Sequence, residues 1–386
     1  MTSDSTIAAI RFGYGLPLPE GAPVTPEAML ALLAGPDRAA RQWPSFDLED
    51  FLQTEVGMAP FYKARREKKP VPPEAQASAD KMVSMTNIAL QATVARALDS
   101  PDGLRERLVA FWASHFTVVI KQKYRRVMAS ALVEDAIRPN LTGRFGDLLT
   151  AVTLHPAMLE YLDQSSSVGP DSRFGMRKNK GLNENLAREL LELHSLGVGA
   201  AYSQTDVTQM AELLTGLTAQ AEKGMVFEAN RAEPGPETVL GKAYDGKGLQ
   251  PIRAVLQDLA LRPETAAHLA RKLAVHFVSD EPDPDLVAAI EAAYIESGGD
   301  LMASYGALLQ HPAAWAMPFE KVRQPYDFVI AGLRAMGISG EAVVAMDRGL
   351  LRGVVLQPMA AMGQPYQSAD GPDGWPEEAA AWITPL

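Results

Sequence analysis

The most constraining feature of this 386-residue sequence is a helical pattern at residues 183–196. At about 100° per residue, Asn185, Glu189 and Glu192 fall within roughly 60° of one another on such a helix. Leucines cover most of the remaining circumference. A helix that is apolar on so much of its surface is expected to be buried, so its polar strip must face a partner group, an ion or a pocket.

Helix start and stop signals recur along most of the chain and predict a mostly α, multi-helix globular fold. Thr25 followed by Pro26 has the form of an N-cap with proline at the first helical position, and Gly35 with Pro36 ends that helix. Ser100 followed by Pro101 repeats the N-cap signal. Further helical patterns cover residues 74–98, 124–138, 143–154, 156–162, 183–196, 204–216, 250–260, 263–277, 284–296, 300–310 and 324–336.

The segment 221–247 departs from this helical pattern. Its β-prone runs at 225–227 and 238–240 are separated by a stretch rich in turn-forming residues, which predicts a small inserted β-hairpin or ordered loop. A second irregular segment, 169–181, contains glycine and basic residues and is long enough to act as a lid or binding loop.

We expect one compact unit built from five consecutive segments. They are an N-terminal helical segment and linker (1–73), a helical core with the candidate site (74–220), the β-prone insertion (221–249), C-terminal helices (250–337) and an irregular tail that wraps the surface (338–386).

Composition excludes several classes of function. The absence of cysteine excludes disulfides, thiolate nucleophiles and cysteine-ligated metals. A net charge of -11 argues against a nucleic-acid partner, and the basic run Lys121 to Arg126 is interpreted as a solvated helix start. Apolar runs are too short to cross a membrane. The N-terminus lacks the features of a secretion signal, so a cytoplasmic location is the default, while a trimmed periplasmic or exported form stays open.

Motif searches add no catalytic signature. The sequence contains no P-loop, no dinucleotide-binding glycine pattern and no nucleophile elbow. Its six histidines lack the spacing of a zinc site: His268 and His276 are eight residues apart, and His194 is expected on the helix side opposite the acidic strip. A zinc site is therefore not expected.

The acidic strip predicts an oxygen-rich pocket. Carboxylate and amide oxygens suit a hard cation such as Mg²⁺ or Ca²⁺, for which Glu189, Glu192 and Asn185 are the candidate ligands. Arg188 is then placed to bind an anionic or hydroxylated ligand. Alternatively, Glu189 or Glu192 acts as a general base whose pKa is raised by burial. The further candidate ligand-binding residues are Asp163, Asn183, Asn185 and Asp206.

The same residues also fit a purely structural network. Glu184–Arg188 and Arg188–Glu192 are both i,i+4 pairs, and Asn183 has the place of an N-cap. Asp206 completes a capping box with Ser203, which is the usual role of a carboxylate at that position.

Residues 183–207 carry the pattern Asn-x-Asn-x-x-Arg-Glu-Leu-x-Glu-Leu-x-x-Leu-Gly, followed by Tyr-x-x-x-Asp-Val. The chain thereby resembles a large bacterial family catalogued as domain of unknown function 1800 (DUF1800). The similarity extends over nearly the whole chain, through Arg11-Phe12-Gly13, Phe111-Trp112, His115-Phe116-Thr117, Ile137-Arg138-Pro139, residues 158–163, Leu240-Gly241, Arg271-Lys272-Leu273, Arg323-Gln324-Pro325, Gly363-Gln364-Pro365 and Pro372-Asp373-Gly374-Trp375.

This resemblance implies little chemistry, because the family has no established activity. Many of its members are exported, and their genes often lie beside those of a second family that resembles phosphatases and sulfatases. The resemblance therefore implies a paired role in an envelope or extracellular process, such as one acting on a polysaccharide. This chain has Ala232, Glu233 and Glu237 where the family pattern has His-Asp and a later Lys, and similar sequences extend past Leu386.

Two functions from different classes follow. The first is a helical protein that binds a small polar or saccharide-like ligand and hydrolyses it, with a divalent cation such as Mg²⁺ or Ca²⁺ assisting. The second is a non-catalytic partner or scaffold protein for a phosphatase- or sulfatase-like enzyme. Substitution of Glu189 or Glu192 separates them, because it abolishes binding in the first case and chiefly lowers thermal stability in the second.

Overall fold

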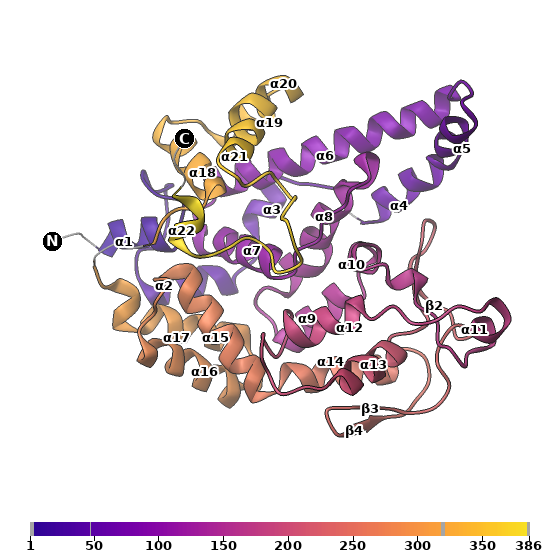
Figure 1. The fold of residues 1–386 in the computed structure, drawn as a ribbon. Coiled ribbons are helices and arrows are strands. Elements are labelled where there is room, and N and C mark those ends of the chain that lie inside the picture. The colour runs from indigo at the N-terminus through magenta and orange to yellow at the C-terminus, as the bar shows by residue number, and fades with distance from the viewer. Residues whose placement is uncertain (1–3, 47, 318–320, 384–386) are drawn as a thin grey trace.

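The long helix α6 (Pro73–Asp99) forms one edge of the molecule, and α4 (Leu48–Gly57) and α5 (Ala59–Glu67) fold back along one of its ends (Figure 1). The computed structural model describes residues 4–46, 48–317 and 321–383. Helices dominate these residues, and the fold is mostly α, as the sequence predicts. None of the helices in these ranges is both long and apolar enough to cross a membrane.

The helices begin and end close to the predicted positions, but one predicted N-cap is wrong. Thr25 caps α2 (Pro26–Ala34) as expected. In α7 (Gly103–His115), however, the cap is Asp102, whose carboxylate accepts the Arg105 N–H at 3.1 Å. The Ser100 hydroxyl instead accepts the N–H of Asp102 at 3.1 Å and so fixes the turn that leads into the helix.

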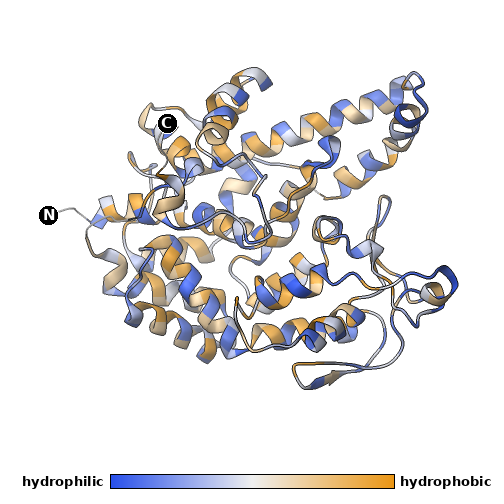
Figure 2. Cartoon of the chain, in the orientation of Figure 1, coloured by the Kyte–Doolittle hydropathy of each residue, from blue (hydrophilic) through white to orange (hydrophobic). Residues whose placement is uncertain are grey.

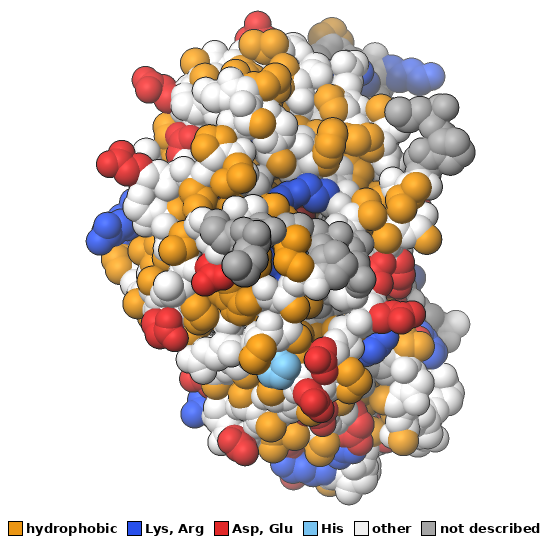
Figure 3. Space-filling model, turned by 90° about the vertical axis from the view of Figure 1, so that its left-hand side faces the viewer, with side chains coloured by type: hydrophobic (Ala, Val, Ile, Leu, Met, Phe, Trp, Pro, Cys, Tyr) orange, Lys and Arg blue, Asp and Glu red, His pale blue; other side chains and the backbone are white. Residues whose placement is uncertain are grey.

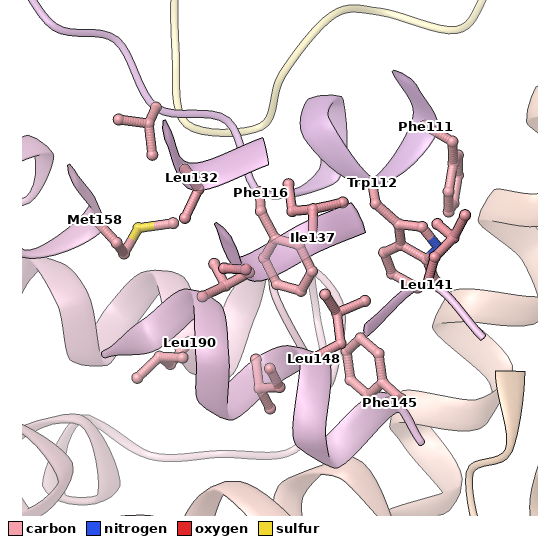
Figure 4. Packing of buried hydrophobic residues seen from close by; sticks show 14 of the residues in the cluster. Phe111, Trp112, Phe116, Leu132, Ile137, Leu141, Phe145, Leu148, Met158 and Leu190 are labelled. Carbon is pink, nitrogen blue, oxygen red and sulfur yellow. The ribbon is translucent and has the colours of Figure 1, made fainter. Parts of the chain in front are cut away.

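Helix α7 lies at the centre of the core. Its Trp112, together with Phe116, packs against Phe145 of α9 (Phe145–Thr153), and Phe111 packs against Trp112 (Figure 4). The buried Trp112 donates its indole N–H to the hydroxyl of Tyr305 at 2.7 Å. This satisfied polar group allows the largest side chain of the core to be buried at little cost.

Two groups of helices flank α7. Helices α15 (Pro263–Phe277), α16 (Pro284–Ser297) and α17 (Leu301–Gln310) pack side by side on one flank, and α14 (Gln250–Ala260) packs on α9 (Figure 1). Figure 2 shows that polar and apolar residues alternate around these helices, as expected where each has one face in the core. The remaining helices are α1 (Asp4–Arg11), α3 (Arg38–Gln42), α8 (Val127–Leu132), α10 (Pro156–Tyr161), α11 (Arg173–Lys178), α12 (Asn185–Glu192), α13 (Gln204–Leu213), α18 (Pro325–Ala335), α19 (Gly340–Val344), α20 (Arg348–Leu351), α21 (Gln357–Ala361) and α22 (Ala379–Trp382).

The β-prone insertion forms two hairpins rather than one. Strand β1 (Leu217–Gln220) pairs with β2 (Gly224–Phe227), and β3 (Glu237–Val239) pairs with β4 (Lys242–Tyr244). The two predicted runs therefore each pair with a nearer segment and not with each other. The second hairpin closes through Leu240 and Gly241, which both have positive φ (51° and 78°), as a two-residue hairpin turn requires.

The predicted lid at 169–181 contains a short helix, α11. Ser172 caps this helix, and the segment is tied to the insertion by the Gly169 N–H to Arg231 carbonyl hydrogen bond (2.9 Å) and by that from Phe174 to Asn230 (3.0 Å). Half of the predicted loop is therefore regular structure held by backbone hydrogen bonds.

The residues after 338 form short helices joined by irregular segments. Helices α18 to α21 pack on α6 through a second apolar cluster that includes Leu98, Ile330 and Val355. The chain between α21 and α22 then crosses in front of α7 as an extended loop, drawn in yellow in Figure 1. This crossing brings the C-terminal residues next to the central helices.

Candidate functional site

Helix α12 (Asn185–Glu192) carries the predicted acidic strip. The helix is shorter than the pattern at 183–196, but its leucines, among them Leu186 and Leu190, are fully buried as expected. On the other side Asn185 is exposed, whereas Glu189 and Glu192 are half-buried. The structure therefore places two carboxylates, one turn apart, at the edge of the core.

Arg188 lies beside this pair without neutralising it. Its guanidinium forms an ion pair with Glu184 at 3.3 Å and donates to the amide oxygen of Gln204 at 3.2 Å. Among the described residues Arg188 forms no ion pair with Glu192. Of the two i,i+4 pairs in the structural alternative, only Glu184–Arg188 is present, and within the described ranges neither carboxylate of the strip forms an ion pair, although the charge of Arg188 partly offsets the burial that raises the pKa of Glu189.

The two carboxylates differ in their surroundings. Glu192 accepts a hydrogen bond from the hydroxyl of Tyr202 at 3.1 Å. The carboxylate of Glu189 has no hydrogen-bond partner among the described residues, although its backbone carbonyl accepts the N–H groups of Leu193 and His194 at 2.9 Å. Burial, and then the negative charges of Glu192 and Asp373, raise the pKa of Glu189 to about 7. Glu189 is thus partly protonated near neutral pH, with a third carboxylate, Asp373, approaching from the C-terminal segment.

Of the other predicted site residues, Asn183 and Asp206 form hydrogen bonds with backbone groups. The Asn183 side chain donates to the Asp163 carbonyl at 3.2 Å and accepts the Asn185 N–H at 2.9 Å, so it shapes the start of α12. The Asp163 side chain is exposed at the turn after α10, where the residue has a positive φ of 53°. Asp206 forms the predicted capping box with Ser203.

Asp206 also accepts the N–H of Leu240 at 2.7 Å, which ties α13 to the second hairpin. Within the described ranges, no group of three or more His, Asp or Glu side chains has an arrangement that could hold a metal ion. The ligand set Glu189, Glu192 and Asn185, which includes an amide, stays a prediction.

Two facing stripes of polar residues lie beside the strip and were missed in the sequence. His268, Lys272 and His276 follow one another at four-residue intervals on α15. They face Arg107 and His115, which are eight residues apart on α7. Arg107 Nη2 lies 3.3 Å from His276 Nε2, and the rings of His115 and His268 are 6.1 Å apart. The available signal was the spacing, four residues on α15 and eight on α7, since residues at such intervals share one helical face.

His194 lies beyond the end of α12, and its ring lies near those of the histidines on α7 and α15. The expectation that His194 projects to the side opposite the acidic strip assumed a continuous helix. Helix α12 ends at Glu192, and the His194 ring lies 6.1 Å from that of His115. Burial, with the nearby charge of Lys272, lowers the pKa of His194 to about 3 and that of His268 to about 4. These rings are therefore neutral at pH 7.

Lys272 is the second cation of this group, beside Arg107. Its side chain is half-buried and has no hydrogen bond or ion pair among the described residues. Burial lowers the pKa of Lys272, while the charges of Glu377 and Asp373 act in the opposite direction. An ammonium group in such surroundings is a candidate for contact with an anionic or hydroxylated ligand.

The C-terminal segment 373–377 joins the acidic pair to the histidine stripe. The backbone N–H of Trp375 donates to the Ser114 hydroxyl at 3.1 Å, which fixes the segment on α7. Glu377 accepts a hydrogen bond from His276 Nδ1 at 2.7 Å and lies 3.4 Å from Lys321. Asp373, four residues earlier, is near enough to Glu189 to raise its pKa.

A cavity of about 150 Å³ lies beyond this segment, between α7, α8 and α18. Many of the polar groups on its wall are already paired: Gln364 donates to Gln324 at 2.9 Å, and Arg138 binds Glu106. Apolar side chains such as Phe116, Met359 and Trp375 form much of the rest. Such a cavity suits an apolar group better than a polar ligand.

A model of the family described as protein of unknown function (DUF1800) matches residues 10–386. The chain belongs to the DUF1800 family. No curated protein and no solved structure matches it. Membership confirms the resemblance seen in the sequence and assigns no activity to this DUF1800 protein. On the face of the DUF1800 protein in Figure 3, described acidic, basic and hydrophobic side chains are interspersed, and the basic ones are scattered.

Proposed function

We propose that this DUF1800 protein binds a small hydroxylated or saccharide-like ligand at the carboxylate pair of α12 and hydrolyses it by acid–base catalysis. The observation that carries the proposal is that Glu189 and Glu192 lie half-buried one turn apart, while the adjacent Arg188 binds Glu184 instead. Placing carboxylates at the edge of the core without a bound cation opposes folding, so a purely structural role is a poor explanation for them.

The different surroundings of the two carboxylates suggest separate roles. With a pKa near 7, Glu189 suits a general acid that protonates the oxygen of the departing group. Glu192, held by Tyr202, suits the general base that removes a proton from the attacking water. The water oxygen then forms the new bond as the bond to the departing oxygen breaks, and the two carboxyl groups have exchanged protonation states.

Residues outside α12 complete the proposed site. Asp373 and Lys272 supply a carboxylate and an ammonium group that could bind ligand hydroxyls. Burial, and then the nearby charge of Glu189, raise the pKa of Tyr161. A divalent cation held by Asn185 with the two glutamates would assist by polarising the ligand.

A panel of chromogenic 4-nitrophenyl glycosides, assayed with and without Mg²⁺ or Ca²⁺, tests this proposal. Glu189→Gln and Glu192→Gln should each reduce kcat/KM at least 100-fold on the best substrate, while circular dichroism stays unchanged. Glu222→Gln, at an exposed glutamate, is the matched control and should retain full activity.

Equal activity in Glu189→Gln and the wild type would contradict a catalytic pair. If the wild type hydrolyses none of the glycosides and both substitutions only lower the melting temperature, the scaffold alternative is favoured. The metal prediction is separate: Asn185→Ala should weaken any stabilisation by Mg²⁺ or Ca²⁺ in a thermal-shift assay.

A further inference from the structure

A second cavity, of about 70 Å³, shares His276, Gln324 and Asp327 with the lining of the larger one. It is bounded by the end of α1, by Arg107 of α7, by the end of α15 and by the segment 321–327. Since a water molecule occupies about 30 Å³, the space has room for a group the size of a tetrahedral oxyanion.

Cations outnumber carboxylates on the wall of this cavity. Four basic side chains line it, against the carboxylates of Asp327 and Glu377. Asp327 is bound by Arg107, Glu377 lies between His276 and Lys321, and Lys321 also forms an ion pair with Asp280 at 2.8 Å. The chain as a whole has a net charge of -11, so a cavity lined by more basic than acidic side chains is unlike the chain's overall composition. The basic residues are Arg11, Arg107, Lys321 and Arg323.

Arg323 is the cation that remains without a carboxylate. Among the described residues its guanidinium has one hydrogen bond, a long one of 3.4 Å to the carbonyl of Ile10. Burial and the positive charges of Arg107 and Arg334 lower the pKa of Arg323 to about 10. A half-buried arginine under repulsion from its neighbours is costly unless an anion compensates it.

Arg107 also has a donor group, its Nε–H, that lacks an acceptor among the described residues. Its side chain is only 8% exposed, and its Nε–H is buried without an acceptor among the described residues. Its two terminal nitrogens are occupied by Asp327 and His276. A buried N–H without an acceptor costs about 1–3 kcal/mol, so an oxygen ligand at this point would stabilise the protein.

From this arrangement we propose that the cavity lined by Arg11, Arg107, Lys321 and Arg323 binds a phosphate or sulfate group. Arginine guanidinium groups match the geometry of such oxyanions, and here they converge from three separate parts of the chain. The site is independent of the carboxylate pair on α12. It would accept either the free anion or the charged end of a larger organic ligand, because His276 and Gln324 also line the larger apolar cavity.

Isothermal titration calorimetry at constant ionic strength, with inorganic phosphate and with phenyl phosphate, tests the proposal on the full chain. The wild type should show saturable binding, and Arg323→Met should raise Kd at least tenfold. Arg323→Lys keeps the charge and should lose less affinity, which separates loss of binding from loss of folding. Arg253→Gln, at an exposed arginine, is the matched control and should bind within twofold of the wild type.

The two probes distinguish the sources of the anion. A tenfold tighter binding of phenyl phosphate would support a larger ligand whose organic part enters the apolar cavity, and equal affinities would support the free anion. The absence of saturable binding of either probe to the wild type, or equal Kd values in Arg323→Met and the wild type, would overturn the proposal. Glu189→Gln should bind phosphate with the same Kd as the wild type. The phosphate proposal can therefore be tested whether or not the α12 hydrolase proposal holds.

Discussion

His276 Nδ1 lies 2.7 Å from a carboxylate oxygen of Glu377, a residue 101 positions later in the chain. This hydrogen bond fixes the C-terminal segment to α15. Because Lys321 and Arg107 also lie near, the Glu377 carboxylate is held in a positive environment although most of its surface is buried.

We expect Glu377 to contribute to acid sensitivity. Burial alone would raise its pKa, but His276, Lys321 and Arg107 outweigh burial and lower it to about 2. A carboxyl group with a lowered pKa stabilises the fold above its ordinary pKa, and this stability is lost as pH falls through about 4.5 towards 2. Glu377→Gln should therefore destabilise the protein by up to about 3 kcal/mol at pH 7 and have little effect near pH 2.

Urea unfolding across this pH range measures the effect. Glu378→Gln, at the exposed neighbouring position, should change the free energy of unfolding by less than about 0.5 kcal/mol. A Glu377→Gln variant as stable as the wild type at pH 7 would contradict the assignment of Glu377 to this positive environment.

Glu189 should affect stability with the opposite sign. Its folded pKa of about 7 lies above the ordinary value of 4.5, so its ionisation opposes folding, and stability falls as pH rises from about 4.5 through 7. Glu189→Gln removes that ionisation. We expect a higher Tm than the wild type at pH 8 and an equal Tm at pH 4, in differential scanning calorimetry. A lower Tm at pH 8 would indicate that the Glu189 carboxylate has a stabilising partner.

Gly374 should tolerate no side chain. Its φ is 83°, and a Cβ atom there would lie 2.2 Å from the carbonyl oxygen of Ser114. Gly374→Ala is therefore expected to destabilise by more than about 1 kcal/mol and to release the segment around Trp375, which limited proteolysis would detect. Gly332 is the control: it lies in α18 with open space around it, so Gly332→Ala should stabilise by about 0.5–1 kcal/mol. If Gly374→Ala and Gly332→Ala resist protease equally, the close packing of Gly374 against the Ser114 carbonyl is contradicted.

Arg138 should be among the most sensitive positions of the core. It binds the buried carboxylate of Glu106 through both terminal nitrogens and Asp37 at 2.6 Å. Arg138→Met leaves Glu106 buried and unpaired, which is expected to cost about 3–5 kcal/mol in urea unfolding. Adding Glu106→Gln should recover part of that loss. If the double variant is less stable than either single one, the two residues do not act as a pair.

Local signals in the sequence were sufficient for much of the fold. The Ser203–Asp206 capping box formed as predicted, because a cap depends on residues within one turn. The prediction of a small β-hairpin region is confirmed, but the strand partners were not specified by the pattern, and the turn at Leu240 and Gly241 pairs the second run with the nearer segment. Likewise Ser100 and Asp102 compete for one helix end, and the choice depends on geometry beyond the motif.

The candidate site was predictable only where it lies on one helix. The strip of Glu189 and Glu192 follows from helical periodicity alone. The approach of Asp373 and Glu377 depends on the path of the C-terminal segment across α7, which no local pattern specifies. The position of His194 shows the same limit, because α12 ends at Glu192, four residues before the predicted end at 196.

The crossing of the C-terminal segment over α7 also sets an order of events during synthesis. Asp373 leaves the ribosome roughly 180 residues after Glu192, which at about 5–20 residues per second is on the order of ten seconds or more. During that interval α12 and α15 can already pack while Lys272 and His276 still lack their carboxylate neighbours. A nascent chain therefore lacks part of the candidate site until residues 373–377 emerge and pack on α7.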